Sequence, residues 1–151
     1  MNAPAPSSEK ARFAEATASF ASRLQSQGFA MSDVDQRDYN PVTHGFADGI
    51  YMRTVKLPAD QILVGKVHKK SHPFFLLKGT MQVLTEHGVE ELTAPHSGVT
   101  PAGTQRIVYT NTECEFTTVH ATAETDLEKI EDELTAEDFS SPELAKFLGE
   151  S

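Results

Sequence analysis

The sequence predicts a mainly β protein: a single antiparallel β-barrel or jelly roll, preceded by a helix and followed by short acidic helices. Between residues 49 and 121, apolar residues recur with the period of β-strands in seven short runs. The breaks between runs carry turn residues such as Gly, Pro, Asn and Asp. The flanking segments follow helical spacing instead. Short, evenly spaced strands are typical of a sandwich or barrel.

The chain has 151 residues, enough to bury one core. We divide it into an N-terminal arm and helix (1–43), a barrel (44–121) and an acidic helical tail (122–151). Residues 1–7 are Pro, Ala and Ser with Met and Asn, which predicts a flexible arm. From Ser8, the residues Phe13, Phe20 and Leu24 recur at helical spacing, with Gly28 as a stop. Such an arm would leave large apolar groups in water, so we expect residues 8–31 to pack partly across a subunit boundary in a homodimer or homotrimer.

The predicted strands and tail helices follow from the same patterns. Gly79 and Gly103 are expected in turns, and residues 125–128 form a capping-box pattern before a helix. A second helix is predicted to start at Ser141 and stop at Gly149. The predicted strands are 50–57, 62–68, 74–77, 81–85, 89–92, 106–110 and 114–121.

Charge and composition exclude several function classes. The net charge is −9, with −10 in residues 113–151 and +2 in residues 44–112, so nucleic acid is not expected as the main partner. The sequence shows no apolar run of about 20 residues and no secretory signal, which predicts no membrane partner and a cytoplasmic location. The lone Cys114 is expected to be a buried thiol.

Two histidines four residues apart, His68 and His72, are the main candidates for function. Strand alternation gives His68 the same face as Ile62 and Val64, and His120 the inward face of its own strand. Three imidazoles could then converge at the barrel mouth and hold Zn, Fe, Ni or Mn. The alternative is that they are ordinary hydrogen-bonded or solvated side chains. The remaining histidines lie in turn-like contexts and are expected at the surface: His44, His87 and His96.

Arg106 and Lys66 are the candidates for binding an anion. A guanidinium facing a barrel pocket is a fixed fork for carboxylate or phosphate. The structural alternative is that Arg106 pairs with an internal acid, for which Glu113 and Glu115 are candidates. Lys66 belongs to the basic cluster of the chain, with Lys69 and Lys70. This cluster could attract an anionic ligand, or it could be a solvated strand end.

Two segments, residues 65–79 and 98–106, resemble the two signature motifs of the cupin superfamily, small β-barrels that often bind a metal in the barrel mouth. The likeness covers roughly residues 49–121. Relative to that pattern, anchored on Gly79, Lys66 stands at the first histidine position, His68 at the second and His72 at the glutamate position. Arg106 stands where the second motif has its histidine. The resemblance therefore implies the fold, while only one usual ligand position keeps its usual residue.

Residues 49–53, 64–68 and 125–131 also resemble segments of small cupin-like proteins encoded by tailed bacteriophages. This resemblance implies a role in virion architecture and a location in the host cytoplasm or the virion. We prefer the hypothesis of a non-catalytic, oligomeric cupin-like protein that contacts copies of itself or other virion proteins, as a capsid decoration, head or tail component. The alternative is a metal-dependent enzyme or a protein that binds a small anion. Whether the chain is an enzyme stays open at this point.

Overall fold

The structure is a computed structural model that describes residues 9–26, 40–136 and 144. A five-stranded sheet has the order β1 (Val42–Ala47), β2 (Ile50–Leu57), β10 (Cys114–Ala121), β5 (His72–Lys78) and β8 (His96–Thr100). A four-stranded sheet has the order β3 (Ile62–Val64), β9 (Ile107–Thr110), β6 (Thr80–Thr85) and β7 (Gly88–Thr93). A short ladder joins β4 (Val67–His68) to β11 (Thr135–Ala136), and every pairing is antiparallel.

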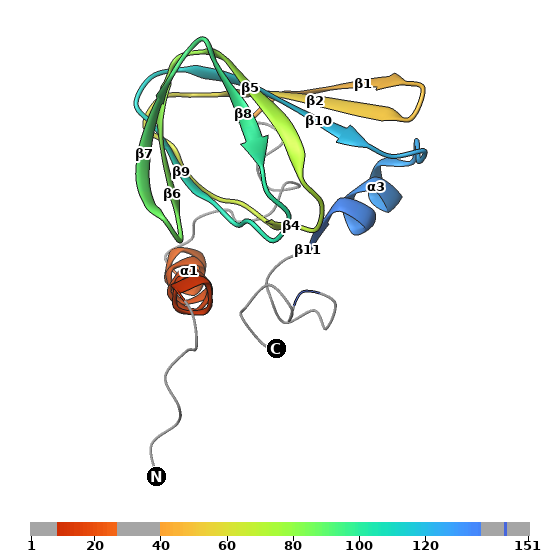
Figure 1. The fold of residues 1–151 in the computed structure, drawn as a ribbon. Coiled ribbons are helices and arrows are strands. Elements are labelled where there is room, and N and C mark those ends of the chain that lie inside the picture. The colour runs from red at the N-terminus through yellow and green to blue at the C-terminus, as the bar shows by residue number, and fades with distance from the viewer. Residues whose placement is uncertain (1–8, 27–39, 137–143, 145–151) are drawn as a thin grey trace.

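The two large sheets lie opposite each other (Figure 1), and buried side chains from both sheets form the core. The five-stranded sheet contributes Leu57, Leu76 and Cys114, and the four-stranded sheet contributes Met81 and Val83. The thiol of Cys114 is buried, as its isolation in the sequence predicted. The prediction of a mainly antiparallel β fold with an N-terminal and a C-terminal helix is therefore confirmed.

The strand boundaries differ from the prediction in two places. The run 62–68 divides into β3 and β4 at Gly65 and Lys66, which ends the simple alternation. Ile62 is exposed while His68 lines the interior, so the expectation that these two side chains share a face is wrong. Strands β1, β8 and β11 were not predicted. In β8, Gly98 lies under the ring of Phe74, where a Cβ atom would come within 3.0 Å of ring carbons.

Gly79 and Gly103 both adopt positive φ, at +93° and +81°. A Cβ atom at Gly79 would lie 2.2 Å from the carbonyl oxygen of Glu113, so only glycine fits this turn between β5 and β6. The expected turns at both glycines are confirmed.

Helix α1 (Glu9–Ser26) confirms the predicted N-terminal helix and lies below the β6–β7 hairpin (Figure 1). Lys10 forms an ion pair with Glu86 and donates a hydrogen bond to the carbonyl oxygen of Gly103 at 2.7 Å. Ala14 packs against Val67. The described part of α1 thus contacts its own chain. A contact of residues 8–31 across a subunit boundary stays a prediction, and the arm 1–7 lies outside the described residues.

Helix α3 (Leu127–Leu134) starts one residue later than a capping box at Thr125 would place it. The N-cap is Asp126, whose carboxylate accepts hydrogen bonds from the backbone of Glu128 and Lys129. Ile130 and Leu134 pack on Tyr51. Through α3 and β11, residues 127–136 join the same packed body as the strands. The second predicted helix, 141–149, lies outside the described residues except for Leu144, which is buried against Val67.

No helix among residues 9–26 and 127–134 is long and apolar enough to cross a bilayer.

Candidate functional site

A cavity of about 670 Å³ lies between the two sheets and borders the apolar core, because Leu57 and Met81 belong to the core and also line the cavity. Towards the cavity, the inward side chains of the long strands change from apolar to polar. On β10 they run from Cys114 through Phe116 and Thr118 to His120, and all but Cys114 line the cavity. This confirms the expectation that Phe116, Thr118 and His120 share one face.

The three predicted histidines meet in this cavity. The ring centroids of His68 and His72 are 4.4 Å apart, those of His72 and His120 are 4.5 Å apart, and those of His68 and His120 are 6.5 Å apart. They come from three elements, because β4, β5 and β10 each supply one ring. Nε2 of His120 shares a hydrogen bond of 2.8 Å with the hydroxyl of Thr118. Nδ1 of His68 and Nδ1 of His72 are buried and have no hydrogen-bond partner among the described residues.

Burial keeps the three imidazoles neutral. It lowers the pKa of His68 to about 3, with smaller contributions from the neighbouring His72, His120 and two arginines. Burial also lowers the pKa of His120 to about 4, helped by His72. The pKa of His72 is lowered by burial as well, although a hydrogen bond with the Lys70 backbone partly offsets this. Neutral imidazoles can accept a hydrogen bond at one nitrogen and donate one at the other.

Arg106 reaches the same cavity from the loop before β9. Its Nη2 donates a hydrogen bond of 2.6 Å to the hydroxyl of Thr100, and its guanidinium carbon lies 4.7 Å from the ring centroid of Phe74. Its Nε is buried and has no partner among the described residues. Burial lowers the pKa of Arg106, and the charge of Glu90 only partly opposes this.

Neither predicted acid pairs with Arg106. Glu113 instead forms an ion pair of 2.9 Å with Lys78 on the outside of the fold. Glu115 also lies on the outward side of β10, opposite Lys56 of β2. Among the described residues, no carboxylate forms an ion pair with Arg106, so the internal-acid alternative finds no partner there.

Lys66 lines the cavity and forms an ion pair with Glu131 of α3. Lys70 pairs with Glu133 at 2.8 Å, and the Lys69 ammonium donates a hydrogen bond to the carbonyl oxygen of Asp132 at 2.7 Å. The basic cluster is therefore a docking surface for the acidic helix, and the alternative of a solvated strand end does not describe it.

The sequence analysis missed further polar side chains of the cavity: Asn40, and Tyr51 and Arg53 on inward positions of β2. His44 of β1 lies opposite Arg53 and also lines the cavity, and it is exposed, as the sequence analysis expected. Nδ1 of His44 and the hydroxyl of Tyr51 share a hydrogen bond of 2.6 Å. Strand alternation could have identified Tyr51 and Arg53, because residues 51, 53, 55 and 57 occupy one face of the predicted strand.

The described residues do not present a formed metal centre. No group of three or more His, Cys, Asp or Glu side chains in the described ranges is arranged to hold a metal ion. Arg106 lines the same cavity as His68 and His72, and its positive charge contributes to lowering the pKa of both imidazoles. A divalent cation between these rings would be repelled by the guanidinium.

No family model matches the sequence, and no curated protein matches it either. Solved structures do match in fold. A salicylate 1,2-dioxygenase from Pseudaminobacter salicylatoxidans matches 72% of this chain at 12% identity and a TM-score of 0.50, over 33% of its own length. A cupin superfamily protein from Desulfitobacterium hafniense DCB-2 matches 55% of this chain at 7% identity and a TM-score of 0.50, over 77% of its own length.

This chain spans about a third of the length of the salicylate dioxygenase. At these identities the likeness concerns the fold alone. One of these two fold neighbours is a cupin superfamily protein, which is the fold that the two motif-like segments implied. The likeness to phage-encoded proteins stays a prediction.

Proposed function

We propose that this protein binds a small organic anion in the cavity between its sheets, with Arg106 as the principal charge partner. The observation that carries the proposal is the charge of the lining. Among the described lining residues, the cationic side chains are Arg53, Lys66 and Arg106, and the acidic side chain is Glu131. All three cations come from residues 44–112, the part of the chain with a net charge of +2, while the whole chain has a net charge of −9.

Unpartnered polar atoms support the same ligand class. Nε of Arg106 and the Nδ1 atoms of His68 and His72 are buried, and a buried polar group without a partner costs free energy. An anion in the cavity would accept hydrogen bonds from the guanidinium and from an imidazole N–H. Its charge would also offset the unfavourable burial of the guanidinium.

The rest of the lining favours a ligand with an apolar body. The volume of about 670 Å³ falls in the range of about 300–1,000 Å³ that is typical of small-molecule sites. The apolar side chains of the lining belong to both sheets and to α3: Val55, Leu57, Leu63, Met81, Val108, Phe116 and Ile130. The ligand class is therefore an amphiphilic carboxylate, sulfonate or phosphate. No reaction is assigned to the site.

Metal binding by His68, His72 and His120 stays a prediction. The neutral imidazoles suit Zn²⁺ or Fe²⁺, but their arrangement and the adjacent Arg106 do not fit a three-histidine centre as the side chains lie. Metal analysis of the purified protein tests this alternative. If His68→Ala lowers a stoichiometric metal content without unfolding the protein, the imidazoles are ligands, and anion binding through Arg106 would need revision.

The experiment for the proposed function compares two fluorescent probes of similar apolar shape. One is 8-anilinonaphthalene-1-sulfonate, an anion, and the other is the uncharged N-phenyl-1-naphthylamine. We expect Arg106→Met to weaken binding of the sulfonate by at least about tenfold, because a charge-assisted hydrogen bond is lost. Binding of the uncharged probe should change little, since the apolar lining remains.

Two controls make the result specific. Lys78→Met removes a positive charge from the exposed pair with Glu113, outside the cavity, and should leave both affinities unchanged. Arg106→Lys keeps a positive charge but loses the planar guanidinium, so its affinity for the sulfonate should lie between those of wild type and Arg106→Met. Equal affinity of wild type and Arg106→Met for the sulfonate would overturn the proposal.

A second candidate function, self-assembly, is favoured by the outer face of the five-stranded sheet. The exposed fractions of Phe75, Leu77 and Val99 on this face are 39%, 56% and 65%. Most outward positions around them carry no charge: Met52, Thr54, Pro73, Ser97, Thr117 and Val119. Glu115 and Lys56 form an oppositely charged cross-strand pair at one end of the face. A second copy of the chain matches this chemistry, because two largely uncharged faces can pack without net repulsion.

Light scattering of the full-length protein tests assembly. Phe75→Lys should reduce the mass to that of one chain, whereas Val89→Lys, at an exposed position of the other sheet, should not. Loss of assembly on deleting residues 1–31, but not in Phe75→Lys, would instead place the contact in the N-terminal segment. A role in a virion stays a hypothesis.

A further inference from the structure

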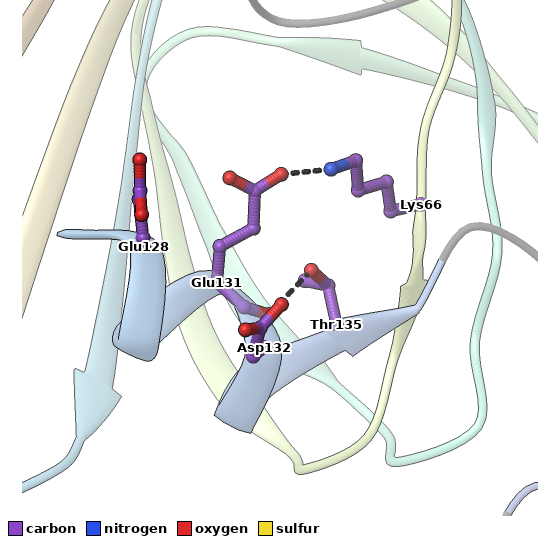
Figure 2. Close-up of a pocket in the computed structure, with 5 residues that line it drawn as sticks. All are labelled: Lys66, Glu128, Glu131, Asp132 and Thr135. Carbon is purple, nitrogen blue, oxygen red and sulfur yellow. Dashed lines mark hydrogen bonds and ion pairs between the residues drawn. The ribbon is translucent and has the colours of Figure 1, made fainter.

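A second, smaller hollow lies beside the cavity and shares a wall with it. This hollow has a volume of about 350 Å³ and is lined by five side chains, drawn in Figure 2: Lys66, Glu128, Glu131, Asp132 and Thr135. Lys66, Glu131 and Thr135 also line the large cavity. Glu128 and Asp132 are exposed, so the small hollow faces solvent. The three shared side chains therefore separate solvent from the interior.

The ion pair of Lys66 with Glu131 is the central part of this wall. Figure 2 shows the two side chains pointing toward each other, one from the segment before β4 and one from α3. The side chains are 25% and 42% exposed, respectively. The pair is thus accessible to water and to a ligand, and an exposed ion pair of this kind contributes little to stability.

The carboxylate of Glu131 binds Lys66 at the edge of the cavity, where the anionic group of a ligand could otherwise bind. Glu131 is the acidic side chain of the described lining, and its carboxylate neutralises one of the three cationic side chains there. A ligand carboxylate, sulfonate or phosphate that approaches Lys66 must compete with it. Glu128 and Asp132 lie beside Glu131 on α3, and their like charges favour its departure once another anion has neutralised Lys66.

Helix α3 does not depend on this ion pair for its position. The backbone N–H of Lys69 donates a hydrogen bond of 2.7 Å to the carbonyl oxygen of Leu134, and β11 pairs with β4. Lys70 binds Glu133, and Ile130 packs on Tyr51. Glu131 can therefore release Lys66 by rotating its side chain while α3 stays docked.

We propose that Glu131 is a tethered competitor: a resident carboxylate that neutralises Lys66 in the empty protein and is displaced when an anionic ligand binds. Glu131 then determines specificity, because only a ligand whose anionic group replaces the carboxylate at Lys66 recovers the lost ion pair. An uncharged ligand would leave Glu131 in place. This inference rests on the proposed function of the cavity.

The test uses the full-length protein and the same two probes. We expect Glu131→Gln to raise the affinity for 8-anilinonaphthalene-1-sulfonate by about fivefold, which is the size of effect an exposed ion pair has. The affinity for N-phenyl-1-naphthylamine should stay the same. Glu128→Gln is the matched control: it removes an equal charge from the same hollow and the same helix, but Glu128 has no ion pair with Lys66 among the described contacts.

Repeating the measurement in the Lys66→Met variant distinguishes competition for Lys66 from a general effect of charge on sulfonate affinity. In Lys66→Met, the sulfonate should bind more weakly than in wild type, and adding Glu131→Gln should then have no further effect. Equal affinities of Glu131→Gln and Glu128→Gln would overturn the inference, as would a gain from Glu131→Gln that persists in Lys66→Met. Failure of the proposed function looks different, because in that case Arg106→Met would bind the sulfonate as wild type does.

Discussion

The two ends of the sandwich are built from the same strands but serve different purposes. At one end the inward positions of β2, β5 and β10 are Leu57, Leu76 and Cys114, which belong to the apolar core, and Leu57 also borders the cavity. At the other end the same strands present polar side chains to a cavity: Tyr51, Arg53, His72, Thr118 and His120. The inward side chains of one strand thus contribute to the packed core at one end and to the binding site at the other, about three inward positions away.

The difference shows that one end of a small sandwich can stabilise the fold while the other end provides a ligand site. Apolar burial stabilises the packed end, because each large side chain removed from water there contributes roughly 1.5–3 kcal/mol. The cavity end buries a guanidinium and three imidazoles, which lowers the pKa of each and costs free energy. The packed end must offset that cost.

The largest expected effect comes from the packed end. Leu76 is 1% exposed in the apolar cluster, so Leu76→Ala removes buried methyl groups and leaves a void. We expect the free energy of unfolding to fall by about 2–5 kcal/mol, measured by urea denaturation. The affinity of the folded protein for the anionic probe should remain within twofold of wild type. A loss of affinity larger than that would show that the two ends are energetically coupled and would break the comparison.

The sequence predicted much of the packed end and part of the cavity. Alternation and turn residues predicted most of the strands, although not β1, β8 and β11, and they gave the inward phase of β10 from Cys114 to His120. The predicted convergence of His68, His72 and His120 is geometrically correct, although the alternation from Ile62 that was used to orient His68 is not, because the strand is interrupted at Gly65 and Lys66. Whether these three bind a ligand or metal stays a prediction.

What the sequence could not predict depends on contacts between distant segments. The pairing of Lys66 with Glu131 joins residues 65 positions apart, and nothing in either local pattern indicates it. The two-residue ladder of β4 with β11 is too short to give a strand signal. Arg106 was expected to pair with an acid, but Glu113 points outward to Lys78. Each of these depends on how α3 and the loops dock on the sheets.

The smallest expected effect concerns α3, which covers the cavity end and has no counterpart at the packed end. Asp126 caps this helix by accepting hydrogen bonds of 3.0 and 3.2 Å from the backbone of Glu128 and Lys129. Asp126→Ala should cost about 1 kcal/mol. Most of that loss should appear as local opening, because α3 is joined to the sheets by the short β4–β11 ladder, a few polar contacts and the packing of Ile130 and Leu134.

Amide hydrogen exchange distinguishes local from global loss. We expect faster exchange at residues 130–134 in Asp126→Ala, while the amides of β10 and β5 keep their protection. Asp132→Ala is the matched control, because Asp132 lies on the same helix but its side chain does not cap it. If strand amides lost protection to the same extent as α3, the helix would be part of the cooperative core, and the cavity end would contribute to stability as the packed end does.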